Sequence, residues 1–482
     1  MAAAPTFLWH DYETFGANPR RDRPAQFAGV RTDLDLNIVG EPVSLYCKPT
    51  DDFLPDPESV LITGITPQTA DARGVIEAEF IGRIHAELAA PGTCGVGYNT
   101  LRFDDELTRH LLWRNLYEPY GREWQQGCSR WDLLDCVRAT YAFRPEDIVW
   151  PLREDGAPSF KLEHLTAANG LAHEAAHDAL SDVLATIAFA KLIKTKQPRL
   201  FDFCFKLRSK SAVNAEMRAA ERRPFLHVSG MYPATRGCLA VVLPLAWHPT
   251  NKNELAVWDL SQDPSELLDL SVDEMRTRMF SKAADLAEGE SRLPIKTIHI
   301  NRSPVVVGNL HSLAPERAAQ LGIDISLALQ HAAQLIVGPE LNDKLQAVYT
   351  RSDSPAQRDV DEGLYDGFLG DGDRRRLDKL RATPVLELAG SALSFDDARL
   401  AELVYRYRAR NWPDSLTAEE AKRWQAHRAD RLRDGAGGVL SLAGLREKLA
   451  TLRNERADDT RALGLLDEVE RYAVEQESSL LG

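Results

Sequence analysis

Two carboxylates, Asp11 and Glu13, are separated by one residue and follow an apolar run at residues 7–9. Side chains alternate in direction along a β-strand, so a strand here places both carboxylates on one face and Tyr12 on the other. Neighbouring carboxylates repel each other, and a cation between them removes that repulsion. Oxygen-only ligands favour Mg²⁺ or Mn²⁺ over zinc, so the pair suggests a divalent metal site. An isolated Asp-x-Glu is more often a solvated strand end.

Further acids and a histidine stand at the edges of other expected elements. Asp104 follows an apolar run and begins a helical pattern, and Asp182 lies one turn into another helical pattern. His177 stands five residues before Asp182, in the turn that enters that helix. Side chains at the edges of separate elements can converge on one pocket, so the sequence predicts one site that contains Asp11, Glu13, Asp104, His177 and Asp182.

Such a set supports hydrolysis of a phosphodiester. Two metal ions about 4 Å apart can clamp the phosphate, one activating the attacking water and the other stabilising the leaving oxygen. Four carboxylates neutralise the two cations, and a histidine whose pKa lies near about 6.5 can accept the proton of the water. Taken alone, the Asp-x-Glu pair and His177 are each more often structural or solvated side chains. Together they predict a metal-dependent nuclease site.

The elements that must position these residues alternate along the first part of the chain. Strands are expected at 6–9, 27–31, 43–47 and 94–98, and helices at 78–88, 104–116 and 178–192, which is an α/β pattern. Four more strands are expected, in a mainly β domain with helical insertions, at 227–230, 239–245, 255–260 and 297–300. Charged residues with Leu or Ala at helical spacing dominate the remainder, after a linker at 352–376. The predicted domains are 1–198, 199–351 and 352–482.

Composition limits the function further. The 482 residues carry a formal charge of −14, which excludes a grip on nucleic acid or lipid by the whole surface but not a local basic groove. Residues 194–223 hold nine basic residues against three acidic ones. The six cysteines form no Cys-x-x-Cys pair, which fits a reducing cytosol. With no signal peptide pattern and no membrane-spanning run, we expect a cytoplasmic protein that does not enter a membrane.

Several stretches resemble known nuclease motifs. Residues 10–16, 98–106 and 176–183 resemble the three motifs of the DEDDh exonuclease superfamily, which hydrolyses nucleic acid from the 3′ end. A narrower resemblance, to the bacterial exodeoxyribonuclease I family, extends over the whole chain and is carried by residues 23–27, 61–67, 129–134, 197–202, 227–231 and 407–411.

The resemblance implies an α/β fold made of a ribonuclease H-like exonuclease domain, an SH3-like β-barrel domain and a C-terminal helical domain around a C-shaped channel. It implies that Asp11, Glu13 and Asp182 bind two Mg²⁺ ions directly, for which Mn²⁺ can substitute. Asp104 then completes the acidic set, and His177 acts as the general base. Glu13 and Lys161 are expected to contact the substrate, although a solvated first-turn lysine explains Lys161 as well.

The implied activity is processive 3′ to 5′ degradation of single-stranded DNA to 5′-mononucleotides, in DNA repair and recombination. Phosphates and exposed bases need cations and aromatic platforms, and the expected DNA contacts are Arg109, Tyr120, Trp124 and Arg138. The basic and aromatic stretch 405–412 is either another strand contact or a helix with solvent-facing arginines.

The resemblance also implies a protein partner, the acidic C-terminal tail of single-stranded DNA-binding protein. Arg144 and Arg223 match basic positions for that contact, and Phe203 stands where better-known family members have tyrosine. A monomer is expected.

Two alternatives remain open. A DEDDh nuclease that acts on RNA or on structured 3′ ends would carry the same catalytic motifs, because these contact phosphate and metal and not the sugar. A non-catalytic single-strand-binding protein could retain the fold, but the five intact residues argue against it.

Overall fold

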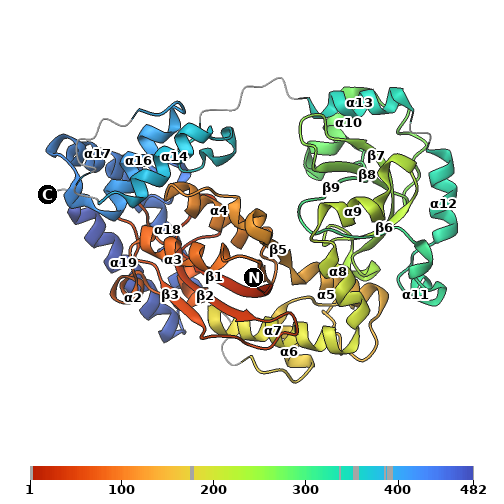
Figure 1. The fold of residues 1–482 in the computed structure, drawn as a ribbon, viewed down its shortest axis with the longest axis horizontal. Helices are drawn as coiled ribbons and strands as arrows, with labels where there is room; N and C mark the ends of the chain where they lie inside the picture. Colours follow the sequence, from red (N-terminus) through yellow and green to blue (C-terminus); the bar gives the residue numbers. More distant parts are fainter. Residues whose placement is uncertain are drawn as a thin grey trace. The chain divides into compact units, whose positions relative to one another are not determined.

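The computed structural model describes residues 4–173, 178–335, 338–350, 358–384, 387 and 394–480. The chain divides into two compact units (Figure 1). The first comprises residues 1–129, 173–184 and 355–482, and the second comprises 130–172 and 185–354. Among the described helices, none combines the length and apolarity needed to cross a membrane.

The sheet of the first unit has the strand order β3-β2-β1-β4-β5. Its strands are β1 (Thr6–Thr14), β2 (Pro24–Thr32), β3 (Val43–Tyr46), β4 (Thr93–Gly97) and β5 (Ser129–Asp132), where the chain passes to the second unit. β1 pairs antiparallel with β2 and parallel with β4. β1 continues beyond its apolar residues, because its pairing with β2 includes Asp11, which lies opposite Ala28, and Glu13, which lies opposite Gln26. The predicted α/β pattern is confirmed.

One face of this sheet is covered by helices. The helices of this part are α1 (Pro57–Thr63), α2 (Pro67–Arg73), α3 (Glu77–Leu88) and α4 (Asp104–Arg114). Tyr12 and Phe27 pack in one core with Phe80 of α3 and with Leu107 and Leu111 of α4. Because side chains alternate along β1, packing Tyr12 into this core turns the side chains of its two neighbours to the opposite face.

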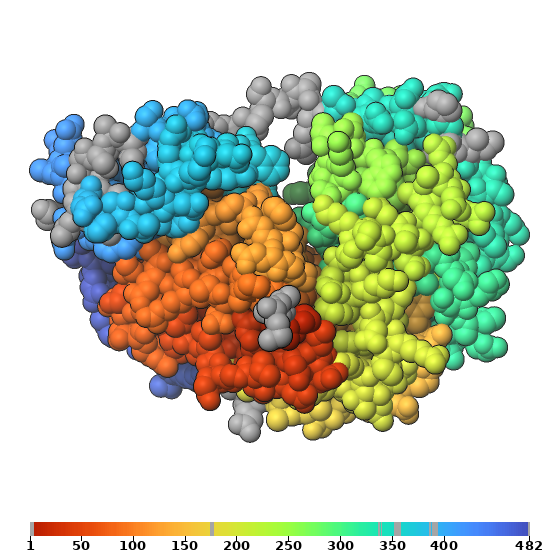
Figure 2. Space-filling view, in the orientation of Figure 1, coloured from red at the N-terminus to blue at the C-terminus, as the bar shows by residue number. Residues whose placement is uncertain are grey.

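The C-terminal part of the first unit is helical, as predicted. It contains α14 (Asp371–Ala382), α16 (Arg399–Asn411), α17 (Ala418–Asp434), α18 (Leu442–Glu455) and α19 (Thr460–Ser479). Leu377 and Leu403 share a core with Trp113 of α4, and Figure 2 shows this blue segment lying directly on the orange part of the chain. The predicted linker is wrong for 371–376, because that stretch begins α14 and Leu377 and Leu380 bury its inner face.

The second unit contains an antiparallel sheet of order β10-β6-β7-β8-β9. Its strands are β6 (Phe225–Val228), β7 (Leu239–Trp247), β8 (Glu254–Asp259), β9 (Ile295–His299) and β10 (Val305–Val307). The four predicted strands are confirmed, and β10 is too short to show a period in the sequence. The accompanying helices are α5 (Leu133–Phe143), α6 (Leu162–Ala168), α8 (Pro198–Lys206), α9 (Lys210–Met217), α10 (Val272–Phe280), α11 (Pro315–Gln320), α12 (Ile325–Gln334) and α13 (Pro339–Tyr349). The three domain boundaries expected from the sequence stay a prediction.

Candidate active site

Three carboxylates from two elements of the first unit converge. Asp11 and Glu13 project from β1, and Asp182 lies in the first turn of α7 (Ala179–Lys196). One carboxylate oxygen of each residue lies within 4.8 Å of those of the other two. The start of α7 is fixed by Asp178, whose Oδ1 accepts a hydrogen bond from the backbone N–H of Ser181 at 3.1 Å. The alternation along β1 and the cap of α7 therefore bring the three acids together.

Asp104 is the first residue of α4 and lies beside this set. Its Oδ1 accepts a hydrogen bond from the backbone N–H of Tyr12 at 3.2 Å, which ties α4 to the strand that carries Asp11 and Glu13. The adjacent acid Asp105 has a different role, because it forms a buried ion pair with Arg122 at 2.6 Å. Asp104 is thus in contact with the strand that carries Asp11 and Glu13.

The pKa values of three carboxyl groups in the acidic set are strongly raised. Burial and then the charge of Asp182 raise the pKa of Asp11 to about 8. Burial, followed by repulsion from Asp11, Asp182 and Asp178, raises the pKa of Glu13 to about 9. Burial and the charge of Asp11 also raise the pKa of Asp104 well above its ordinary value. Carboxylates that repel one another so strongly need either protons or a cation, and oxygen-only donors fit Mg²⁺ or Mn²⁺.

We expect the stabilisation of the protein by Mg²⁺ to grow with pH. The folded state binds more protons than the unfolded chain at Asp11 and Glu13, whose pKa values are raised to about 8 and 9. Metal-free stability therefore falls as pH rises from the ordinary carboxyl pKa of about 4 up through these folded-state values. Mg²⁺ must displace those protons, so it binds more tightly at about pH 9 than at about pH 6. Thermal unfolding with and without Mg²⁺ at both pH values measures this, and an equal Tm increase at both would contradict it.

Two histidines flank the start of α7. His177, the predicted general base, lies outside the described residues, so its role stays a prediction. His173 was not predicted: its Nε2 lies 2.5 Å from Oδ1 of Asp182, and its side chain is buried. No spacing rule marks a histidine nine residues before an aspartate, and the one sequence signal is that His173 stands four residues before His177.

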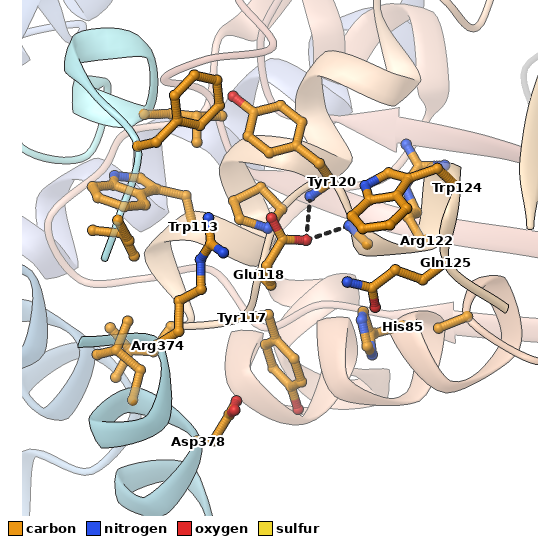
Figure 3. A pocket seen from close by; sticks show the side chains of 18 of the residues that line it. His85, Trp113, Tyr117, Glu118, Tyr120, Arg122, Trp124, Gln125, Arg374 and Asp378 are labelled. Carbon is orange, nitrogen blue, oxygen red and sulfur yellow. Dashed lines mark hydrogen bonds between the residues drawn. The ribbon is translucent and has the colours of Figure 1, made fainter. Parts of the chain in front are cut away.

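The predicted DNA contacts of the first unit differ in how far their side chains are exposed to solvent. Trp124 is 67% exposed and Tyr120 is half-buried (Figure 3). Arg109 is buried, and its Nε and Nη2 donate to the two carboxylate oxygens of Glu123 at 2.7 and 2.8 Å. Glu123 already compensates the charge of Arg109, and a contact of Arg109 with DNA stays a prediction. The glutamate that neutralises it lies on the next turn of chain, where sequence spacing gives no sign of the pairing.

The candidate residues of the second unit also differ in their exposure to solvent and in their partners. Nη1 of Arg138 donates to Asp135 at 2.7 Å, and the guanidinium packs so closely on Gly230 that a Cβ there would lie 2.7 Å from Nη2. Lys161 is exposed and lies 3.5 Å from Glu163. Arg223 is exposed beside Glu221, at 3.2 Å. These positions fit surface contacts for Lys161 and Arg223 and a partly buried one for Arg138, and their roles stay predictions.

Arg144 lines a cavity of about 410 Å³ in the second unit. Its guanidinium donates to the carbonyl oxygen of Ser312 at 3.3 Å. The apolar part of the wall comes from α5, α8 and the end of β10, with Phe143, Pro198, Leu200, Phe203 and Val307, and the polar part from Gln197, Arg199 and Ser312. An arginine at the rim of an apolar cavity suits a ligand that combines an anion with an apolar side chain.

Comparison with known proteins identifies the family. Three family models match in succession: "Exonuclease" at residues 8–190, "Exonuclease I SH3-like domain" at 208–351 and "Exonuclease I C-terminal domain" at 358–476. Exodeoxyribonuclease I of Escherichia coli is 46% identical over 98% of this chain and 98% of its own length. The solved structure of E. coli exonuclease I with a dA16 oligonucleotide superposes with a TM-score of 0.93 at 46% identity, covering 98% of this chain and 100% of that one. For exonuclease I from Methylocaldum szegediense, the TM-score is 0.92 at 48% identity with the same coverage.

These matches confirm the expected fold class, an exonuclease domain followed by an SH3-like domain and a C-terminal helical domain. They run through both compact units and nearly the whole sequence, and the acidic set lies inside the stretch matched by the exonuclease model. The chain therefore belongs to the exodeoxyribonuclease I family.

Proposed function

We propose that this protein removes nucleotides from the 3′ end of single-stranded DNA and releases 5′-mononucleotides. The observation that carries the proposal is the convergence of Asp11, Glu13 and Asp182 in a chain of this family. We further propose that these three residues hold Mg²⁺, as two ions, and that Asp104 supports them. Solved structures of E. coli exonuclease I include one described as the zinc-bound form of its complex with single-stranded DNA, which supports a divalent metal at this site.

The residues of the chain would divide the chemistry among them. A bound divalent cation would supply positive charge to a phosphodiester and to the attacking water. Asp11 and Glu13 are held rigidly by the pairing of β1, and Asp182 by the capped start of α7, so the carboxylates are placed before the substrate arrives. We assign proton transfer from the water to His177 because of its place in the motif. Lys161 is a candidate for a phosphate contact at the end of the strand.

Single-stranded DNA is the substrate that we favour over RNA. The E. coli relative has been solved with DNA oligonucleotides, dA16 among them. The acidic set itself does not separate DNA from RNA, because it contacts phosphate and metal. We also propose that the protein degrades its substrate processively and acts in DNA repair and recombination. We propose further that it is a cytoplasmic monomer.

A direct test compares DNA and RNA strands of the same sequence, each labelled at its 5′ end, with Mg²⁺ present. We expect the DNA to shorten stepwise from its 3′ end, mononucleotides carrying a 5′ phosphate to accumulate, and the RNA to persist. Faster loss of RNA would replace the proposal with an exoribonuclease. Binding of the strand without any shortening would support a non-catalytic single-strand-binding protein.

We also propose that the cavity at Arg144 receives the acidic C-terminal tail of single-stranded DNA-binding protein. Its apolar wall and rim arginine fit a peptide that ends in a carboxylate beside an apolar side chain. A solved structure of SSB and exonuclease I with an inhibitor is similar to this chain, with a TM-score of 0.90 at 45% identity, and supports the partner.

Replacing Arg144 with alanine should weaken binding of a synthetic tail peptide by about 10- to 100-fold, the loss expected for a charge-assisted hydrogen bond. Arg223→Ala should have a smaller effect, because Arg223 does not line this cavity. Arg153→Ala, which removes an exposed arginine paired with Asp155, is the matched control and should bind like the wild type. Fluorescence anisotropy of a labelled peptide measures all three, and equal affinities would contradict the assignment.

A further inference from the structure

His173 contacts a carboxylate that the proposed function assigns to the metal site. Its Nε2 lies 2.5 Å from Oδ1 of Asp182. An ionised carboxylate only accepts hydrogen bonds, so the imidazole is the donor and Nε2 carries the proton of this contact. The side chains of His173 and Asp182 are 7% and 20% exposed, so water competes little with the hydrogen bond. The contact therefore holds the carboxylate of Asp182 in one direction.

The other acids of the set are positioned by the backbone of β1. Asp11 and Glu13 lie within the paired stretch of this strand, and Oδ1 of Asp104 accepts a hydrogen bond from one of its backbone N–H groups. Asp182 stands in the first turn of α7, where the helix fixes its Cα but leaves two side-chain torsions free to rotate. The hydrogen bond from His173 supplies the constraint that the helix does not.

A histidine suits a carboxylate that must also hold a cation. A buried aspartate of the same unit, Asp105, pairs instead with an arginine, Arg122, at 2.6 Å. A guanidinium is always charged, so beside a metal site it would neutralise the carboxylate and repel the cation. An imidazole can donate a hydrogen bond through one ring nitrogen without carrying a charge. It can therefore orient Asp182 and leave the negative charge of the site available to a metal.

The hydrogen bond at Oδ1 also leaves room for a metal. A carboxylate has two oxygens with about four lone-pair positions, and one bond to an imidazole occupies only one of them. One oxygen of Asp182 lies within 4.8 Å of oxygens of Asp11 and Glu13, so the anchored carboxylate already faces its two neighbours. In metal sites, groups that hydrogen-bond to the ligands orient them, and loss of such a group typically lowers metal affinity or activity by about 10- to 100-fold.

We infer that His173 is a positioning residue of the metal site, which holds the carboxylate of Asp182 in the direction in which it binds a divalent cation. The inference rests on the proposed function and adds to it a residue that acts through Asp182. His177 keeps the role of general base, so the two histidines that precede α7 have different tasks. Loss of a general base slows the chemical step, whereas loss of a positioning residue raises the metal concentration that fills the site.

The test measures binding of Mn²⁺ to the full-length protein without DNA, from the electron paramagnetic resonance signal of the free ion. His173→Phe keeps a ring in the buried position but removes the donor, and we expect it to weaken binding by about 10- to 100-fold. His173→Gln, which keeps an N–H donor at a similar reach, should retain most of the wild-type affinity. In strand degradation by His173→Phe, the Mg²⁺ concentration for half-maximal rate should rise by a similar factor, and saturating Mg²⁺ should restore the maximal rate.

His299→Ala is the matched control, because it also removes a histidine beside a carboxylate. Nδ1 of His299 lies 3.5 Å from Oε1 of Glu254 in the second unit, and this variant should bind Mn²⁺ like the wild type. Thermal unfolding in chelator shows whether each variant folds, and His173→Ala takes the place of His173→Phe if the larger ring is not accommodated. Failure of both to fold would make His173 a structural residue and overturn the inference.

Wild-type affinity for Mn²⁺ in the folded variant without a donor would also overturn the inference. The same holds for a loss of maximal rate that saturating Mg²⁺ does not restore, with metal affinity unchanged, because that result would assign proton transfer to His173. If the wild type shortens DNA in Mg²⁺ but metal affinity does not depend on His173, only the inference fails. A wild type that leaves the strand intact in Mg²⁺ would remove the proposed function itself.

Discussion

Replacing Asp182 with asparagine is expected to slow strand degradation by on the order of 10³-fold or more, while the metal-free protein stays at least as stable as the wild type. The loss follows because one of three converging carboxylates no longer carries the charge that holds a divalent cation. The stability follows from the same geometry, since the charge of Asp182 contributes to the raised pKa values of Asp11 and Glu13, about 8 and 9. Without the negative charge of Asp182, the remaining carboxylates of the metal-free site repel one another less.

The measurement pairs single-turnover degradation of single-stranded DNA with thermal unfolding in chelator at about pH 9, where Asp11 and Glu13 are more fully ionised and repel Asp182 more than at neutral pH. Asp202→Asn, which alters an exposed aspartate of α8, is the control and should change neither. A variant that folds normally and keeps the wild-type Mg²⁺-dependent rate would remove Asp182 from the site. A variant that unfolds would show instead that Asp182 has a mainly structural role.

Replacing Arg410 with alanine is expected to destabilise the first unit by about 3–5 kcal/mol, as for removal of one partner from a buried ion pair. Arg410 is almost fully buried in α16, where its Nη2 lies 2.8 Å from Oδ2 of Asp52 and its Nη1 lies 2.9 Å from Oδ1 of Asp361. Arg23 is buried in the same cluster, 3.6 Å from Asp52. Without Arg410, two buried carboxylates lose their main counter-charge. Chemical denaturation measures the loss.

The loss of stability at acidic pH should change as well. Although burial opposes it, Arg410 holds the pKa values of Asp52 and Asp361 well below their ordinary range. The stabilisation from these depressed pKa values is fully present above the ordinary carboxyl pKa of about 4, and is lost as pH falls through the folded-state values. Arg410→Ala should therefore weaken the dependence of stability on acid. Arg446→Ala, which breaks an exposed pair with Glu477, should cost within about 1 kcal/mol. Equal losses in the two variants would contradict the account of the cluster.

The three converging carboxylates can be predicted from the sequence because local rules determine their positions. Alternation along a strand puts Asp11 and Glu13 on one face, and a capped helix start places Asp182 in its first turn, whatever the rest of the chain does. The sheet, the mainly β second unit and the helical C-terminal segment follow from the same periodicities. Position within a motif could not locate His173, whose contact with Asp182 is a tertiary contact that no local rule predicts.

Partners far apart in sequence account for the errors. The sequence leaves open whether the 405–412 stretch contacts the strand or is a helix with solvent-facing arginines. The solvent-facing alternative is wrong for Arg406, Arg408 and Arg410, and the strand contact stays a prediction. The structure buries all three against acids, which belong to a different part of the chain in the case of Asp52 and to a later helix in the case of Glu420. The pairing of Arg109 with Glu123 is likewise not evident from the sequence, and a contact of Arg109 with DNA stays a prediction. A sequence shows which residues are charged. Whether such a residue is available to bind a ligand depends on which opposite charges the fold brings near it.

The most direct test of the central claim follows a 5′-labelled single strand, with the matching duplex alongside, in Mg²⁺ and in chelator, and resolves the products by length. The account predicts rapid stepwise shortening of the single strand in Mg²⁺, none in chelator, and a duplex that persists. Shortening that continues in chelator would contradict a metal site at Asp11, Glu13 and Asp182, and a strand that stays intact in Mg²⁺ would contradict the nuclease itself.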